Sequence, residues 1–176
     1  MRSTVRRHPR LFTLAALGCA LVLAAPLVAY VIVPALVRST LVEPLPAATP
    51  AAIATGAPDV TSAPEATPAT LARGELVRIT AVDYGSGVVR IIRSGSDSFV
   101  RFEDVDIAGA PNMYVYLSDR SDGKPGAYVD LGKLKATNGS FNYQIPPGVD
   151  IAAVHSVVVW CRQFSVTVTY AVVTPP

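Results

Sequence analysis

The sequence predicts an all-β fold, an antiparallel β-sandwich, for the C-terminal part of this 176-residue chain, preceded by a single transmembrane helix and a Pro-rich linker. Three features support this prediction. From residue 74 onward, short apolar or alternating runs are separated by Gly, Pro, Asn and Asp clusters, as is typical of strands and turns. Residues 11–37 contain no charged side chain. Residues 38–73 contain six prolines and no aromatic residue.

The N-terminal part of the chain is predicted to place a cytoplasmic basic tail, residues 1–10, before a transmembrane signal-anchor helix, residues 11–37. Roughly twenty helical residues cross the ~30 Å hydrocarbon core, so the apolar run is long enough. Four arginines precede it: Arg2, Arg6, Arg7 and Arg10. Because only Arg38 follows it closely, the positive-inside rule predicts a single-pass protein of the cell membrane with an extracytoplasmic C-terminal domain. The alternative is a cleaved signal peptide, with small residues near Ala24, but the apolar run continues well past that point.

Residues 38–73 are predicted to form a disordered Pro/Ala/Thr-rich linker. The absence of aromatic residues leaves the segment too little apolar surface to build a core. Closely spaced prolines favour extended, semi-stiff segments. We therefore expect a spacer that holds the domain off the bilayer.

Seven strands are expected in the domain of residues 74–176. They cover residues 76–83, 88–93, 98–102, 113–117, 141–144, 157–161 and 164–173. Turns are expected at residues 84–87 and 94–97, and Asn138-Gly139 is interpreted as a further turn in preference to a glycosylation acceptor. Seven short strands are typical of a sandwich.

The strand at residues 157–161 is predicted to be central, because both of its faces are apolar. Trp160, on the face opposite Cys161, is expected to fill the core. In the next strand the apolar residues alternate with Ser and Thr and form one face: Phe164, Val166, Val168 and Tyr170. The parity changes between the two strands, which predicts a bulge or tight reversal at Arg162-Gln163.

Four segments of the domain carry a family resemblance: residues 114–118 (YVYLS), 128–135 (YVDLGKLK), 142–146 (NYQIP) and 156–161 (SVVVWC). In their order and spacing, across residues 74–173, they resemble the electron-transfer DM13 domain family. The resemblance implies a β-sandwich module, often extracytoplasmic, that carries electrons through the cysteine of its Trp-Cys motif and is related to haem-binding DOMON domains. That cysteine corresponds to Cys161.

Cys161 is the candidate catalytic, redox-active residue. The other cysteine, Cys19, lies in the predicted span, so Cys161 has no bridge partner in its own compartment. We expect a membrane-anchored extracytoplasmic module, not a stand-alone enzyme, that acts in electron transfer with an unidentified redox or surface partner. The alternative is a cell-surface interaction or adhesion module that uses loops such as residues 118–126, with Cys161 merely buried.

The remaining candidates for a cofactor site are His155 and Met113, which supply the other imidazole and thioether of the domain. A His/Met pair can hold haem iron, although a surface histidine is the simpler interpretation. The cofactor is left unknown, with haem or a metal as options. No metal site is predicted, because the loop aspartates fit turns: Asp104, Asp106, Asp119 and Asp122. Acidic and basic residues are interspersed in the domain, so no nucleic-acid partner is expected.

Overall fold

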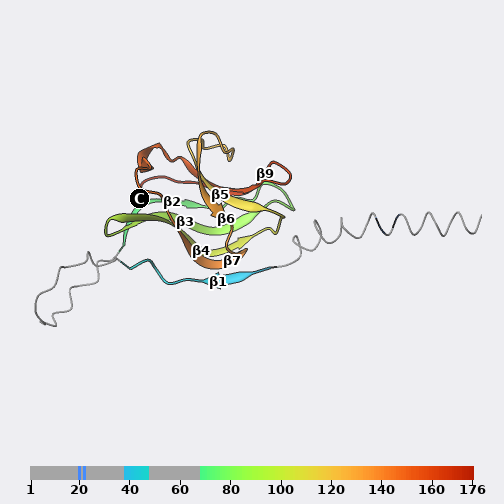
Figure 1. Cartoon of the computed structure of the whole chain (residues 1–176), viewed down its shortest axis with the longest axis horizontal. Coiled ribbons are helices and arrows are strands. Elements are labelled where there is room, and N and C mark those ends of the chain that lie inside the picture. The colour runs from blue at the N-terminus through green and yellow to red at the C-terminus, as the bar shows by residue number, and fades with distance from the viewer. Residues whose placement is uncertain (1–19, 21, 23–37, 48–67) are drawn as a thin grey trace, which may run out of the picture.

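The computed structural model describes residues 20, 22, 38–47 and 68–176 (Figure 1). The predicted cytoplasmic tail, nearly all of the predicted transmembrane segment at residues 11–37 and residues 48–67 of the predicted linker lie outside this range. In the part of the chain that the structure describes, no helical segment has the length and hydrophobicity of a membrane span.

The described residues form two sheets that pack face to face, and the predicted all-β sandwich is confirmed. The five-stranded sheet has the order β1-β7-β4-β3-β2, and the four-stranded sheet has the order β6-β5-β8-β9. The strands are β1 (Thr40–Val42), β2 (Ala69–Glu75), β3 (Gly85–Ser94), β4 (Asp97–Ile107), β5 (Met113–Ser118), β6 (Tyr128–Lys133), β7 (Asn138–Gln144), β8 (Ser156–Cys161) and β9 (Val166–Val172). Neighbouring strands are antiparallel except for β1 and β7, which are parallel.

The core lies between the two sheets. On the five-stranded side Phe102 and Phe141 stack with ring centroids 5.1 Å apart, and Tyr143 meets both rings edge-on. On the four-stranded side, β8 contributes Val157, Val159 and Cys161, all fully buried. Buried aromatic rings remove large apolar areas from water and fix the spacing of the sheets.

Several local predictions are confirmed. β3 and β4 form a hairpin that turns at Gly95 and Ser96. β8 is central, because it pairs with β5 on one side and β9 on the other. A tight reversal at residues 162–165, with Ser165 at a positive φ of 54°, joins β8 to β9.

The expected strand at residues 76–83 is wrong, and so is the turn at residues 84–87. The strand lies earlier, at Ala69–Glu75, and residues 76–84 form a loop in which the backbone N–H groups of Ile79 and Thr80 both donate to the Asp83 carbonyl. β3 then starts directly at Gly85. Of the apolar residues that suggested a strand, Leu76 is buried in the core although its backbone lies outside the regular ladder, whereas Ile79 and Val82 are exposed in the loop.

The Asn138-Gly139 turn is also wrong, since these residues open β7. Gly139 has a φ of 106°, and an added Cβ would lie 2.2 Å from the carbonyl oxygen of Leu41 in β1. The glycine therefore permits the close approach of β1. From the sequence alone, the same Asn-Gly pair was interpreted as a turn. β6 was not among the expected strands.

The predicted face of β9 is wrong at Tyr170. The pairing with β8 shifts between Val159 and Trp160, so that β9 carries one extra residue, Val168. The side chain of Thr169 therefore faces the core, where its hydroxyl donates to the Val77 carbonyl, and Tyr170 lies on the outer face. A bulge shifts the alternation of every residue beyond it.

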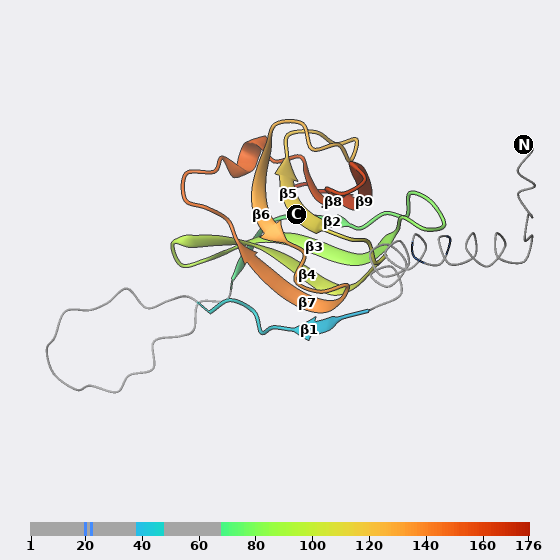
Figure 2. The same ribbon diagram turned by 45° about the vertical axis from the view of Figure 1, so that its right-hand side comes forward.

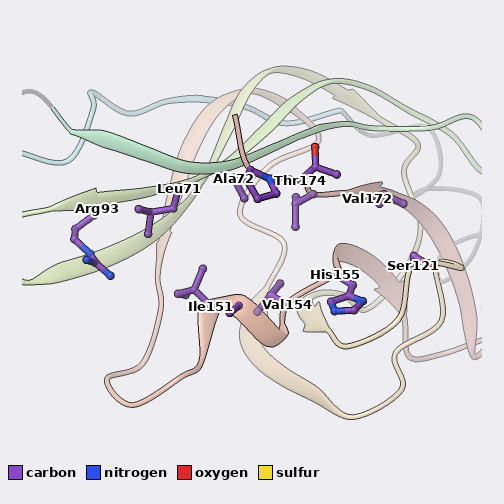
Figure 3. A pocket seen from close by; sticks show the side chains of 12 residues that line it. Leu71, Ala72, Arg93, Ser121, Ile151, Val154, His155, Val172 and Thr174 are labelled. Atoms are coloured by element: carbon purple, nitrogen blue, oxygen red, sulfur yellow. The ribbon is translucent and has the colours of Figure 1, made fainter.

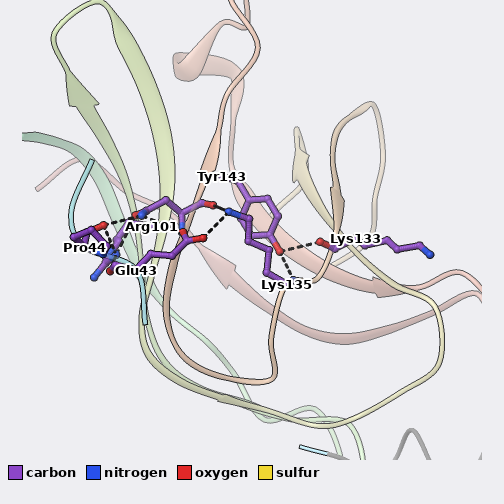
Figure 4. A network of polar contacts seen from close by, with 7 residues as sticks. Glu43, Pro44, Arg101, Lys133, Lys135 and Tyr143 are labelled. Atoms are coloured by element: carbon purple, nitrogen blue, oxygen red, sulfur yellow. Dashed lines mark hydrogen bonds and ion pairs between the residues drawn. The ribbon is translucent and has the colours of Figure 1, made fainter. Parts of the chain in front are cut away.

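The structure differs from the predicted linker at both of its ends. β1 pairs with β7, and β2 pairs with β3 and crosses the expected domain boundary at residue 74. The segment after β1 is held by side chains: Arg101 Nη1 donates to the carbonyl of Glu43 at 2.7 Å, and the Glu43 carboxylate accepts from the Lys135 ammonium at 3.0 Å (Figure 4). These polar contacts to residues far away in the sequence act together with Leu41, which packs against the core, to hold the segment in place.

Candidate functional site

The Cys161 thiol lies at the end of β8 and points into the core. The side chain is fully buried, and within the described residues it is a free cysteine. Its Sγ lies 3.0 Å from the carbonyl oxygen of Pro111, to which the thiol donates. A thiol is a weak donor, so this contact orients the sulfur without removing it from chemistry.

A surface groove of about 340 Å³ reaches Cys161. Its lining comes from three loops of the same end of the sandwich, at residues 76–84, 108–112 and 162–165, which we call the Cys161 end. The lining residues are Ala81, Val82, Asp83, Tyr84, Ala108, Gly109, Ala110, Pro111, Cys161, Phe164 and Val166. The thiol thus contributes to a groove although its own surface is covered.

Local hydrogen bonds shape the walls of the groove. The Thr80 hydroxyl accepts from the backbone N–H groups of Val82 and Asp83, which fixes the loop tip. The Ala108 N–H donates to the Tyr84 carbonyl and closes the two loops against each other. Asn112 adopts a positive φ of 56° and its carbonyl accepts from the Arg162 N–H, so the third loop is attached as well.

Met113 lies directly opposite Cys161 in the pairing of β5 with β8. Directly paired residues place their Cβ atoms about 4.5–5.5 Å apart on the same face. The Met113 side chain is half-buried and packs against the core. One of the two weak cofactor candidates is thus a neighbour of the thiol.

His155 lies at the other end of the sandwich, which we call the His155 end. It precedes β8, and its exposed side chain lines a separate pocket of about 610 Å³ together with Ser121, Ile151 and Val172 (Figure 3). The six residues of β8 separate it from Cys161 and Met113 by roughly 20 Å at about 3.4 Å per residue. The structure therefore does not bring His155 and Met113 together, and a His/Met haem site is not formed.

Trp160 faces away from Cys161, as the alternation predicts, but it does not fill the core. It is half-buried on the outer face of the four-stranded sheet, beside Thr167 and Tyr170. The loop between β5 and β6 covers the part of the outer face around Trp160, with the hydroxyls of Ser118 and Thr167 donating to carbonyls of that loop. The second apolar face of β8 thus packs under a loop.

A cluster of aromatic and charged residues on this outer face was not expected from the sequence. The Arg162 guanidinium lies 3.4 Å from the centroid of the Tyr114 ring, donates to the Tyr116 hydroxyl and pairs with Asp130. The Tyr116 hydroxyl and the Asp130 carboxylate hold the pKa of Arg162 above its usual range. The sequence did contain one signal for this cluster: Tyr114 and Tyr116 are two positions apart in β5, and strand alternation puts both rings on the same face.

The loop aspartates serve the backbone and nearby basic groups. Asp119 accepts from the Ala127 N–H, Asp122 pairs with Arg120, and Asp106 pairs with Arg38. Among the residues that the structure covers, no group of three or more His, Cys, Asp or Glu side chains is arranged to hold a metal ion.

Comparison with known families gives a match over residues 80–173, to the family described as electron transfer DM13. The chain belongs to the DM13 family. No curated protein and no solved structure matches the chain.

The DM13 match covers β3 to β9 and all the residues that line the Cys161 groove. β1 and β2 lie outside it, one at each edge of the five-stranded sheet. The family supports an electron-transfer-related role for the domain, and the position of Cys161 in the groove gives that role a structural candidate.

Proposed function

We propose that this DM13 domain transfers electrons through the Cys161 thiol and that it does so outside the cytoplasm, tethered to the membrane by residues 11–37. The observation that carries the proposal is the position of the sulfur. Among the residues that the structure describes, Cys161 is the one cysteine, and it is both free and part of the lining of a groove. The uncharged run at residues 11–37 and the arginines before it support the tether.

The chemistry that a single thiol offers is exchange with a partner disulfide. The Cys161 thiolate attacks one sulfur of that disulfide, a mixed disulfide forms, and the partner's second sulfur leaves as a thiolate. Two electrons move from Cys161 to the leaving sulfur, and the proton of the Cys161 thiol passes to solvent or to that sulfur. A donor dithiol completes the transfer: its first thiolate attacks the Cys161 sulfur and releases the partner as a dithiol, and its second thiolate then attacks the donor sulfur of the new mixed disulfide and releases Cys161 as a thiolate. The donor is oxidised to a disulfide, the partner disulfide is reduced to two thiols, and two electrons have passed through Cys161.

The covered sulfur sets a condition on this chemistry. Disulfide exchange needs in-line approach to Sγ, so the loops at residues 76–84 and 108–112 must separate before a partner can react. A groove of this size admits a side chain or a slender peptide loop and not a folded domain. We expect the loops to open far more often than the whole sandwich unfolds, because such loops have fewer buried contacts than the strands.

The test is the rate at which a small thiol reagent labels Cys161 in the full chain. A Cys19→Ser background leaves one thiol, methyl methanethiosulfonate is the reagent, and mass spectrometry reports the modified fraction. Hydrogen exchange of the β8 amides gives the rate at which the whole domain unfolds. We expect Cys161 in the native protein to be labelled at least about tenfold faster than this rate would allow. Cys161→Ser in the same background serves as the control and should show no labelling.

Labelling that occurs only at the rate of global unfolding contradicts the redox proposal. It favours the second candidate function, an interaction or adhesion module in which Cys161 is a core residue. Full burial of the side chain and its contact with the Pro111 carbonyl are the observations on which that second candidate depends.

A further inference from the structure

The Cys161 end of the sandwich exposes apolar side chains on adjacent loops. Val82 at the tip of one loop is 75% exposed, Phe164 in the β8-β9 turn is 49% exposed, and both line the same groove. Ile79 and Val166 are exposed beside them. Single exposed apolar residues are ordinary, but several on neighbouring loop tips are typical of an interaction surface.

The chain reaches the domain at this same end. Arg38 donates to the hydroxyl of Tyr84, a lining residue of the groove, and pairs with Asp106 at the end of β4. β1 then runs from there along the edge of the sheet, away from the Cys161 end (Figure 2). The uncharged run of the sequence ends at residue 37, directly before Arg38.

We infer that the Cys161 end lies against the lipid bilayer, with Val82 and Phe164 in the interfacial layer. The inference depends on the proposed membrane tether and adds an orientation to it. A stalk of thirty-odd residues would let the domain turn freely, but β1 begins two residues after Arg38, so the tether is short. The proposed tether therefore joins the domain at the Cys161 end. This is also the end that exposes apolar side chains, which lipid would cover.

Charges at this end suit a headgroup layer. Arg78 is exposed next to Ile79, with its guanidinium 4.5 Å from the centroid of the Tyr84 ring. Arg162 lies in the β8-β9 turn and is already paired with Asp130, so Arg78 is the basic group that this argument uses. A basic group with a long aliphatic stem, flanking apolar tips, is the composition of interfacial segments that bind anionic lipid.

The orientation narrows the class of partner for the Cys161 thiol. With the groove facing the bilayer, a disulfide that reaches it belongs to a partner that is itself in or on the membrane. A partner diffusing in the surrounding fluid would meet the His155 end first, where β8 starts about 20 Å away.

The experiment uses the full chain in vesicles of phosphatidylcholine and phosphatidylglycerol, with or without bromine on the acyl chains. Trp160, the one tryptophan of the chain, is replaced by Phe, and a reporter is introduced as Val82→Trp, Phe164→Trp or, as a control at the His155 end, Val172→Trp. Interfacial side chains sit about 5–10 Å into the headgroup and acyl boundary, so we expect brominated lipid to lower the emission of the first two reporters about twofold. The control should keep its emission.

Extraction with alkaline carbonate separates the two proposals. If the chain stays with the vesicles and the reporters at residues 82 and 164 are quenched no more than the one at residue 172, the orientation is refuted while the tether stands. If the chain leaves the vesicles, the tether fails and the orientation fails with it.

A second measurement applies if the tryptophan variants do not fold. Hydrogen exchange of residues 76–84 is compared in vesicle-bound full chain and in its Val82→Asp, Phe164→Asp double variant, with Val172→Asp as the control. Faster exchange in the double variant alone supports the orientation, and equal exchange in all three chains refutes it.

Discussion

At the Cys161 end of the sandwich, apolar side chains surround a groove that leads to a buried thiol, whereas at the His155 end an exposed imidazole lies beside the last residues of the chain. The first end receives the chain from its N-terminal side through Arg38. The second end closes through a bridge between Arg73 and Thr174. One strand, β8, runs from one end to the other.

Because they lie at opposite ends of the sandwich, the Cys161 thiol and the His155 imidazole cannot act in one site. A sulfur and an imidazole separated by the length of a strand share neither a substrate nor an iron atom. Changes in chemistry should therefore follow substitutions at the Cys161 end, and substitutions at the His155 end should leave thiol reactivity as it is.

The largest effect is expected from Gly139→Ala, which tests whether the attachment of β1 belongs to the Cys161 end. Gly139 and Gly132 have similar positive φ values, 106° and 102°, so alanine at either site carries backbone strain of about 1–3 kcal/mol. At Gly132 an added Cβ meets nothing within 4 Å, but at Gly139 it would lie 2.2 Å from the Leu41 carbonyl oxygen. Gly139→Ala should therefore destabilise the protein by more than Gly132→Ala does.

Guanidinium unfolding of the two variants measures the difference in free energy of unfolding, and hydrogen exchange of residues 39–43 shows where it arises. Gly139→Ala should expose the β1 amides, and Gly132→Ala should leave them protected. Equal losses of stability with β1 protected in both variants would mean that β1 contributes nothing at this edge.

The attachment of β1 also shows why the sequence predicted one part of the fold and not the other. β8 was recognisable as a central strand because its residues are apolar on both faces, and that property is local. β1 depends on Glu43, whose carboxylate accepts from the backbone of Asn142, and on Arg101, which bonds the carbonyls of Glu43 and Pro44. No local pattern reports partners that lie 57 to 99 positions away.

The candidate site was predictable to a similar degree. Cys161 was identified because a lone thiol in this part of the chain has no bridge partner and because the domain resembles DM13. Its burial was left open as the alternative interpretation, and the groove was not predicted, because both depend on loops at residues 76–84 and 108–112, the first of which was expected to be a strand. Strand alternation placed Trp160 on the face opposite Cys161, but the loop that covers this outer face comes from residues beyond β5, which the alternation does not describe.

The second effect concerns access to the thiol through the groove. Ala110 lines the groove at the Cys161 end, and Ala152 lines the pocket at the His155 end. Ala110→Trp should fill the groove and slow the labelling of Cys161 about tenfold, equivalent to about 1.4 kcal/mol in the barrier to access. Ala152→Trp should leave the rate unchanged. A slower rate in both variants, measured in the Cys19→Ser background, would show that reagent enters by another route.

The smallest effect is expected from Glu43→Gln, at the contact that holds the segment after β1 along the edge between the two ends. Burial alone would raise the pKa of Glu43, but the backbone N–H of Asn142 and the ammonium of Lys135 hold it below its usual value of 4.5 (Figure 4). A carboxylate whose pKa is lower in the folded state contributes stability above its unfolded pKa and loses it as the pH falls through the folded pKa.

At pH 7 the Glu43→Gln variant should be less stable than the unmodified chain by only about 1 kcal/mol, because the pair of Glu43 with Lys135 is partly solvated. As the pH falls through the lowered folded-state pKa of Glu43 the two proteins should converge, since the carboxylate of the unmodified chain becomes protonated there. Urea unfolding at pH 7 and pH 3 measures both free energies, and a difference that persists undiminished at pH 3 would assign the effect to amide packing instead of charge.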